Sequence, residues 1–126
     1  MKPCYWLLLA SIFGATGVMA GAFGAHGLKE RLTPDMLAIF ETSARYQLLH
    51  ALALLGVAAV SSTWNNRTLE LAGWAFTLGI VVFSGSLYLL TLTGARWWGA
   101  VTPVGGVSLI VGWVMLGLAA VRHQLE

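Results

Sequence analysis

The chain has 126 residues, of which 58% are hydrophobic and 10% are charged. An average soluble domain carries about 25% charged residues, so this composition does not supply a water-facing surface and indicates a membrane protein. The net charge of +2 comes from scattered residues without a basic run or a basic face, which argues against nucleic acid as a partner.

Four long stretches contain no Asp, Glu, Lys or Arg. Each can cross about 30 Å of hydrocarbon as a helix, and a segment in lipid must satisfy its backbone hydrogen bonds internally. We therefore predict an all-α fold, an integral membrane bundle of four helices that forms a single domain over residues 1–126. The predicted spans are residues 5–25, 46–60, 69–92 and 97–121. Aromatic residues, which prefer the headgroup layer, mark the span ends: Tyr5, Trp6, Trp64, Trp97 and Trp98.

The first span carries a regular series of glycines at intervals of 3, 4 and 3: Gly14, Gly17, Gly21 and Gly24. Small residues let helices in a membrane approach closely, so all four are predicted to make helix-packing contacts. The alternative for this segment is a cleaved signal peptide, with Lys2 at its charged start and a small-residue site at Val18-Met19-Ala20. The apolar run continues to residue 25, longer than a signal core, and favours a retained span.

The second helix is predicted to begin before its membrane span. Thr33 can cap the helix, Pro34 suits the first helical position and Asp35 favours the positive end of the helix dipole. Residues 36–45 include Glu41 and Arg45, whose i,i+4 spacing suits an ion pair on a helix surface. We expect this part to be an amphipathic extension at the membrane interface.

The fourth span is predicted to begin irregularly, because Pro103 lacks a backbone donor and lies among glycines. A kink absorbed by packing is favoured over a broken helix that binds an ion. Further along, Ser108 and Gly112 form a small-xxx-small pair and are predicted to contact another helix.

Polar side chains in a span usually face the bundle interior, where they are functional candidates. The predicted buried polar cluster has these members: His26, Tyr46, Gln47, His50, Ser84, Ser86 and Tyr88. Three interpretations are open: a hydrogen-bonded cluster that fixes helix register, a path for a proton, ion or small solute, and a haem site with His26 and His50 as axial ligands. The first is favoured, because proton relays commonly use a buried carboxylate and a haem needs both histidines at one depth.

No catalytic residue, cofactor or metal site is predicted. No serine has a histidine and a carboxylate that could activate it as a nucleophile, because the acidic residues lie in loops or at helix starts. The single cysteine, Cys4, cannot form an intrachain disulfide, and a zinc site would need more His or Cys ligands. The chain is therefore expected not to be an enzyme.

Residues 21–28, Gly-Ala-Phe-Gly-Ala-His-Gly-Leu, resemble the signature of a family of small bacterial inner-membrane proteins known as domain of unknown function 423. Four further motifs extend the resemblance over nearly the whole chain: Tyr46-Gln47 with His50-Ala51-Leu52, residues 83–88, residues 102–106, and Gly112-Trp113. The resemblance implies a retained first helix and a location in the bacterial inner membrane, and it implies no activity. These motifs fall on the predicted polar cluster. Because the first span ends on the side of the membrane where the second begins, we expect the cluster, including His26 and His50, to meet near one membrane face.

The favoured function is that of a non-enzymatic accessory or assembly subunit, which packs in the lipid bilayer with other membrane proteins or with itself. The main alternative is a transporter or channel for a small solute or proton. Four short helices leave little room for a pore in one copy, so transport would require an oligomer.

Overall fold

The computed structural model describes residues 2–126, which form helices and contain no strand. The elements in chain order are α1 (Pro3–His26), α2 (Pro34–Val60), α3 (Arg67–Gly79), the π-helical segment η1 (Ile80–Ser84), α4 (Gly85–Thr93), the 3₁₀ segment η2 (Arg96–Ala100) and α5 (Thr102–Leu125). The third span is continuous over Arg67–Thr93 and the fourth over Arg96–Leu125, so four helices are long and apolar enough to cross a membrane. The predicted fold class is confirmed.

Local sequence signals mark where several helices begin and end. The Met36 backbone N–H donates to Thr33 Oγ1 over 3.3 Å, so Thr33 caps α2 as predicted. In the same way, the Leu69 N–H donates to Asn66 Oδ1 over 2.9 Å, so Asn66 caps α3. After α4, Gly94 adopts a left-handed conformation with φ of 74°, which a residue with a side chain adopts only at a cost.

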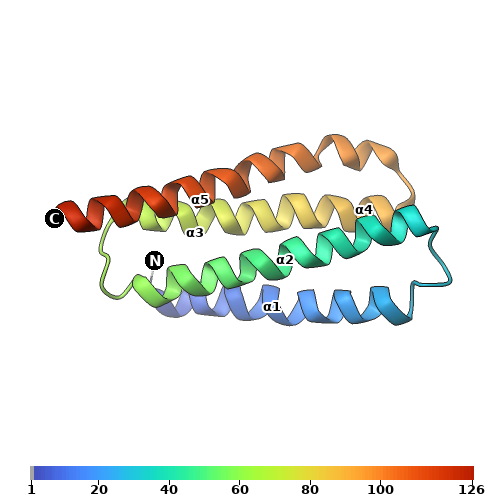
Figure 1. The fold of residues 1–126 in the computed structure, drawn as a ribbon, viewed down its shortest axis with the longest axis horizontal. Helices are drawn as coiled ribbons and strands as arrows, with labels where there is room; N and C mark the ends of the chain where they lie inside the picture. The colour runs from blue at the N-terminus through green and yellow to red at the C-terminus, as the bar shows by residue number, and fades with distance from the viewer. Residues whose placement is uncertain (1) are drawn as a thin grey trace.

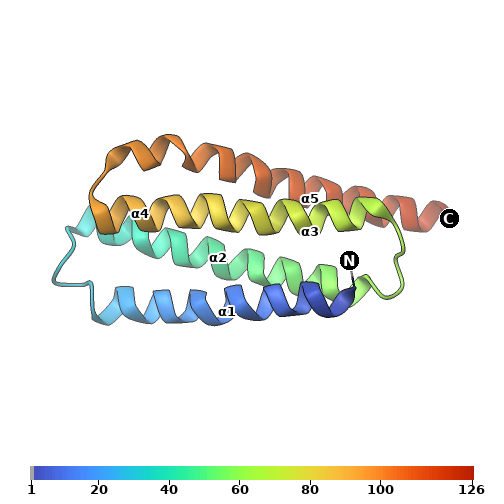
Figure 2. The same cartoon turned by 180° about the vertical axis from the view of Figure 1, so that it is seen from behind.

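The four spans form two packed pairs that meet through the inner helices. Helix α1 packs along α2, and α3 packs along α5, while α2 also contacts α3, η1 and α4. Figure 1 and Figure 2 show α1 and α5 on opposite outer sides of the molecule, with both chain termini at the same end. The outer helices therefore expose far more apolar surface than α2, which is half-buried along its span.

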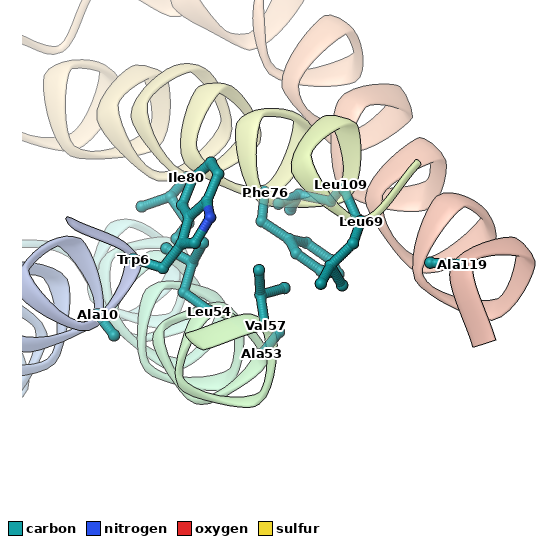
Figure 3. Close-up of a cluster of buried hydrophobic side chains, with 11 residues drawn as sticks. Trp6, Ala10, Ala53, Leu54, Val57, Leu69, Phe76, Ile80, Leu109 and Ala119 are labelled. Atoms are coloured by element: carbon teal, nitrogen blue, oxygen red, sulfur yellow. The ribbon is translucent and has the colours of Figure 1, made fainter. Parts of the chain in front are cut away.

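The apolar core lies between α2, α3 and the ends of α1 and α5 (Figure 3). Trp6 is only 1% exposed, and its ring fills the space beside Gly73, where an added Cβ would lie 2.5 Å from the ring. Trp6, predicted to mark a span end, lies in the first turn of α1 and packs inward against Gly73. Tyr5 is half exposed at the same helix end.

The glycines of α1 divide into two sets with different surroundings. An added Cβ would lie 2.9 Å from Leu48 at Gly17 and 2.9 Å from Phe40 at Gly24, so both allow α2 to approach. Nothing lies within 4 Å of an added Cβ at Gly14 or Gly21, so these two take no part in the packing. Three residues of an α-helix turn by about 300°, which is about 60° short of a full turn. Gly17 and Gly24 therefore face α2, while Gly14 and Gly21 are rotated away from it.

The start of α2 lies within the bundle. Phe40 is 3% exposed against Gly24, so residues 36–45 run beside the last turns of α1. Glu41 and Arg45 are exposed on the opposite face and form no ion pair with any residue in 2–126.

The fourth span begins with the short segment η2 and then a helix that starts near Pro103. Proline suits this first turn, where its missing N–H has no intrahelical partner to lose, so Pro103 stands at the start of α5. The predicted contacts of Ser108 and Gly112 are made with α3: Ser108 Oγ donates to the Ala75 carbonyl over 2.8 Å, and an added Cβ at Gly112 would meet Phe76 at 2.6 Å.

Candidate functional site

Gln47 lies at the centre of the polar cluster and joins three helices. It projects from α2, where it is 5% exposed. Its Nε2 donates to the Phe13 carbonyl over 2.9 Å and to Thr16 Oγ1 over 2.7 Å, both on α1. Its Oε1 accepts from the Tyr88 hydroxyl of α4 over 2.7 Å. Both amide hydrogens and the amide oxygen therefore have partners within the chain.

Ser43 and Ser84 form a reciprocal pair between α2 and η1. The Ser43 hydroxyl donates to the Ser84 carbonyl over 2.7 Å, and the Ser84 hydroxyl donates to the Ser43 carbonyl over 2.8 Å. Both side chains are buried, at 0% and 2% exposure. Ser84 ends the π-helical segment, and the backbone of the neighbouring Phe83 packs against Gly105 of α5. The segment is thus held between two helices.

We expect Ser43→Ala and Ser84→Ala each to lower the free energy of unfolding by about 0.6 kcal/mol, the average for hydrogen bonds between membrane helices, and by at most about 1.7 kcal/mol. The double variant should lose close to the sum, because each hydroxyl donates to the backbone carbonyl of the other serine, which alanine retains. Unfolding by SDS in mixed micelles would measure the effect. Ser11→Ala is the matched control, because Ser11 is exposed and bonds only to Leu7 of its own helix. Equal stability of the three single variants would contradict the assignment.

His50 has a partner at each ring nitrogen. The Trp113 indole N–H donates to His50 Nε2 over 3.1 Å, so Nε2 acts as the acceptor. Nδ1 lies 2.7 Å from the Tyr46 carbonyl and must then carry the proton. This arrangement corresponds to a neutral imidazole without a free lone pair, so the same geometry does not offer His50 to a metal or a haem iron.

The structure does not bring His26 into the cluster. His26 is exposed at the end of α1, level with the start of α2. The contact between Gly24 and Phe40 sets the register of the two helices, and His50 lies ten residues beyond Phe40, about 15 Å along the axis. The expected meeting of His26 and His50 does not occur, because α1 and α2 run antiparallel.

The other predicted members are placed as follows. Tyr46 is 39% exposed, and its ring lies 4.9 Å from that of Phe83. Ser86 Oγ lies 2.6 Å from Thr102 Oγ1 and links α4 to α5. Within residues 2–126, every buried side-chain nitrogen or oxygen atom has a hydrogen-bond partner. Chemically, the cluster can therefore fix the relative depth and rotation of the helices, and its donors and acceptors are already used.

A family model described as "Protein of unknown function (DUF423)" matches residues 20–106. The chain belongs to this family. The matched range contains the motif at residues 21–28, so the family predicted from that motif is confirmed. No solved structure matches the chain.

Relatives in the family cover nearly the whole length of this DUF423 chain. It is 42% identical to a UPF0382 membrane protein of Staphylococcus epidermidis, over 93% of this chain and 95% of the relative. It is 40% identical to the UPF0382 membrane protein YwdK of Bacillus subtilis, over 94% and 97% of the two chains. It is 39% identical to the UPF0382 inner membrane protein YgdD of Escherichia coli, over 97% and 93%. With its four apolar helices, the chain is a multi-pass protein of the bacterial inner membrane.

The sequence does not predict three members of the DUF423 hydrogen-bond network: Thr16, Thr102 and Trp113. Threonine and tryptophan are common in membrane helices, where threonine often bonds to its own helix and tryptophan often marks the interface. Two signals could have pointed to them: Trp113 lies near the middle of its predicted span, away from both interfaces, and both Thr102 and Trp113 fall in motifs of the family resemblance.

Proposed function

We propose that this protein is a non-enzymatic accessory or assembly subunit that packs against another membrane protein through the outer face of α1. The observation that carries the proposal is the open space at Gly14 and Gly21. A glycine within a helix costs about 1 kcal/mol relative to alanine in water, and these two make no contact within the chain that offsets such a cost. In a membrane, small residues favour the close approach of a second helix.

The surroundings of Gly14 support this proposal. A groove of about 470 Å³ runs between α1 and α2, and its walls include Gly14, Val18 and Leu52. The residues that line the groove are apolar except for Ser11, whose hydroxyl is bonded to its own helix. A groove of this kind suits the side chains of a transmembrane helix.

The polar cluster gives less support to the alternative function, the transport of a small solute or proton, than to the role of an accessory subunit. A solute that passed Gln47 would have to displace its hydrogen bonds to Thr16 and Tyr88. Those bonds hold α1 and α4 on α2, so the path would open only with a rearrangement of the bundle.

Gly14→Leu and Gly21→Leu should leave the folded chain as stable as the original and remove co-purifying membrane proteins, because leucine would fill the space that the partner's helix needs. The test is purification of the tagged full chain in mild detergent at native expression level, with unfolding measured on the same samples. Gly17→Leu is the contrasting variant, since Leu48 occupies its space, and it should destabilise the chain itself. If a stoichiometric partner remains bound to both open-face variants, or if the original chain purifies without any partner, the proposal is wrong.

A further inference from the structure

A cavity of about 540 Å³ lies between α2, α4 and η2, at the end of the bundle that holds the α1–α2 loop. Six residues line it: Thr33, Asp35, Met36, Ile39, Leu90 and Arg96. This size falls within the range of small-molecule pockets, about 300–1,000 Å³. The lining combines one carboxylate and one guanidinium with three apolar side chains.

The two charged residues of this cavity have no ion-pair partner among residues 2–126. Both of them, Asp35 and Arg96, are exposed. Thr33 already accepts the hydrogen bond from the Met36 N–H that caps α2, so its Oγ1 is partly occupied. The cavity thus offers an anion and a cation that are both available to a ligand.

The residues around the cavity indicate that it lies at the membrane surface. Leu90 lies in the last turn of the third span, and Arg96 begins the fourth. Trp97 and Trp98 follow Arg96 directly and stack with ring centroids 4.0 Å apart. Tryptophan prefers the headgroup layer, so the charged residues lie at headgroup depth, while Leu90 is buried on the apolar side.

We propose that this cavity binds a phospholipid whose headgroup carries a primary ammonium beside its phosphate, with Arg96 binding the phosphate and Asp35 binding the ammonium. A guanidinium binds phosphate oxygens through two parallel hydrogen bonds. The Asp35 carboxylate disfavours a headgroup with negative charge alone. A quaternary ammonium lacks the N–H donors that a carboxylate accepts, so a choline headgroup should bind less well. Met36, Ile39 and Leu90 would contact the first carbons of the acyl chains.

This proposal is independent of the partner-binding face of α1, because α1 lines no part of the cavity. The test is native mass spectrometry of the full chain in detergent, with phosphatidylethanolamine, phosphatidylcholine and phosphatidylglycerol of identical acyl chains added in equal amounts. The original chain should retain phosphatidylethanolamine in preference to the other two. An exposed charge pair is worth up to about 1 kcal/mol, so Asp35→Asn should lower its retention about fivefold and remove its preference over phosphatidylglycerol. Arg96→Gln should lower the retention of all three lipids.

Glu41→Gln and Arg45→Gln are the matched controls, because they remove exposed charges of α2 that line no part of the cavity. Both should bind lipid as the original chain does. Equal retention of the three lipids by the original chain, or a preference that persists in Asp35→Asn, would overturn the proposal. Thermal unfolding of the original chain with each lipid provides a second readout that needs no variant, and only phosphatidylethanolamine should raise the melting temperature clearly. An equal rise with free phosphoethanolamine would also overturn it, since the ligand would then be a soluble molecule.

Discussion

Gly105→Ala is expected to lower the free energy of unfolding by about 1–3 kcal/mol, the usual cost of inserting a methyl group into a filled contact. The added Cβ would fall on the Phe83 backbone, 2.7 Å from its Cα and closer still to its nitrogen. A flexible side chain could rotate away from such a contact, but backbone atoms of a helix cannot. The Phe83 backbone is also held on the far side by the reciprocal bonds of Ser84 with Ser43.

Gly106→Ala is the control for this prediction, because it adds the same methyl group one position further along α5. There the new Cβ would lie 3.7 Å from the Phe83 ring, an ordinary van der Waals contact. The two substitutions have the same effect on helix propensity and on the unfolded chain, so their difference measures the close approach alone. SDS titration in mixed micelles should show Gly106→Ala near the original stability. If both variants unfold at the same SDS fraction, the contact between α5 and η1 is not as tight as the structure has it.

The helices and their order could be predicted from the sequence, because span length and the absence of charge depend on residues close together along the chain. Thr33 illustrates this, since its cap involves an N–H only three residues away. The contacts between helices could be predicted less well. Gly14 and Gly17 look alike in the sequence, but only the register of α1 on α2 places Leu48 beside Gly17.

The same limit applies to the polar cluster and to η1. Gln47 and Tyr88 were within reach of prediction, because buried polar groups in a membrane must find one another. His26 lies in another motif of the same family resemblance, but it ends a helix at another depth. The π-helical turn of η1 is not predicted from Ile80–Ser84, and the residues that contact this segment, Ser43 and Gly105, lie far from it in the sequence.

Gln47→Leu is expected to lower the free energy of unfolding by about 2–3 kcal/mol. The substitution replaces the amide with an apolar side chain of similar size and removes three hydrogen bonds between helices, each worth about 0.6 kcal/mol on average and up to about 1.7 in membrane proteins. The Tyr88 hydroxyl would lose the acceptor that it has on Gln47. Thr16 would keep its bond to the Ile12 carbonyl, which limits the loss on α1.

A double-mutant cycle with Tyr88→Phe separates the bond to α4 from the two bonds to α1. Tyr88→Phe should lower the free energy of unfolding less than Gln47→Leu does. The double variant should lose less than the sum of the two single losses, since either change removes the same hydrogen bond. Gln124→Leu is the control, because Gln124 is exposed near the end of α5. A stable Gln47→Leu chain would show that these bonds do not hold the bundle together. The polar groups would then be retained for another purpose, and the transport interpretation would become the stronger one.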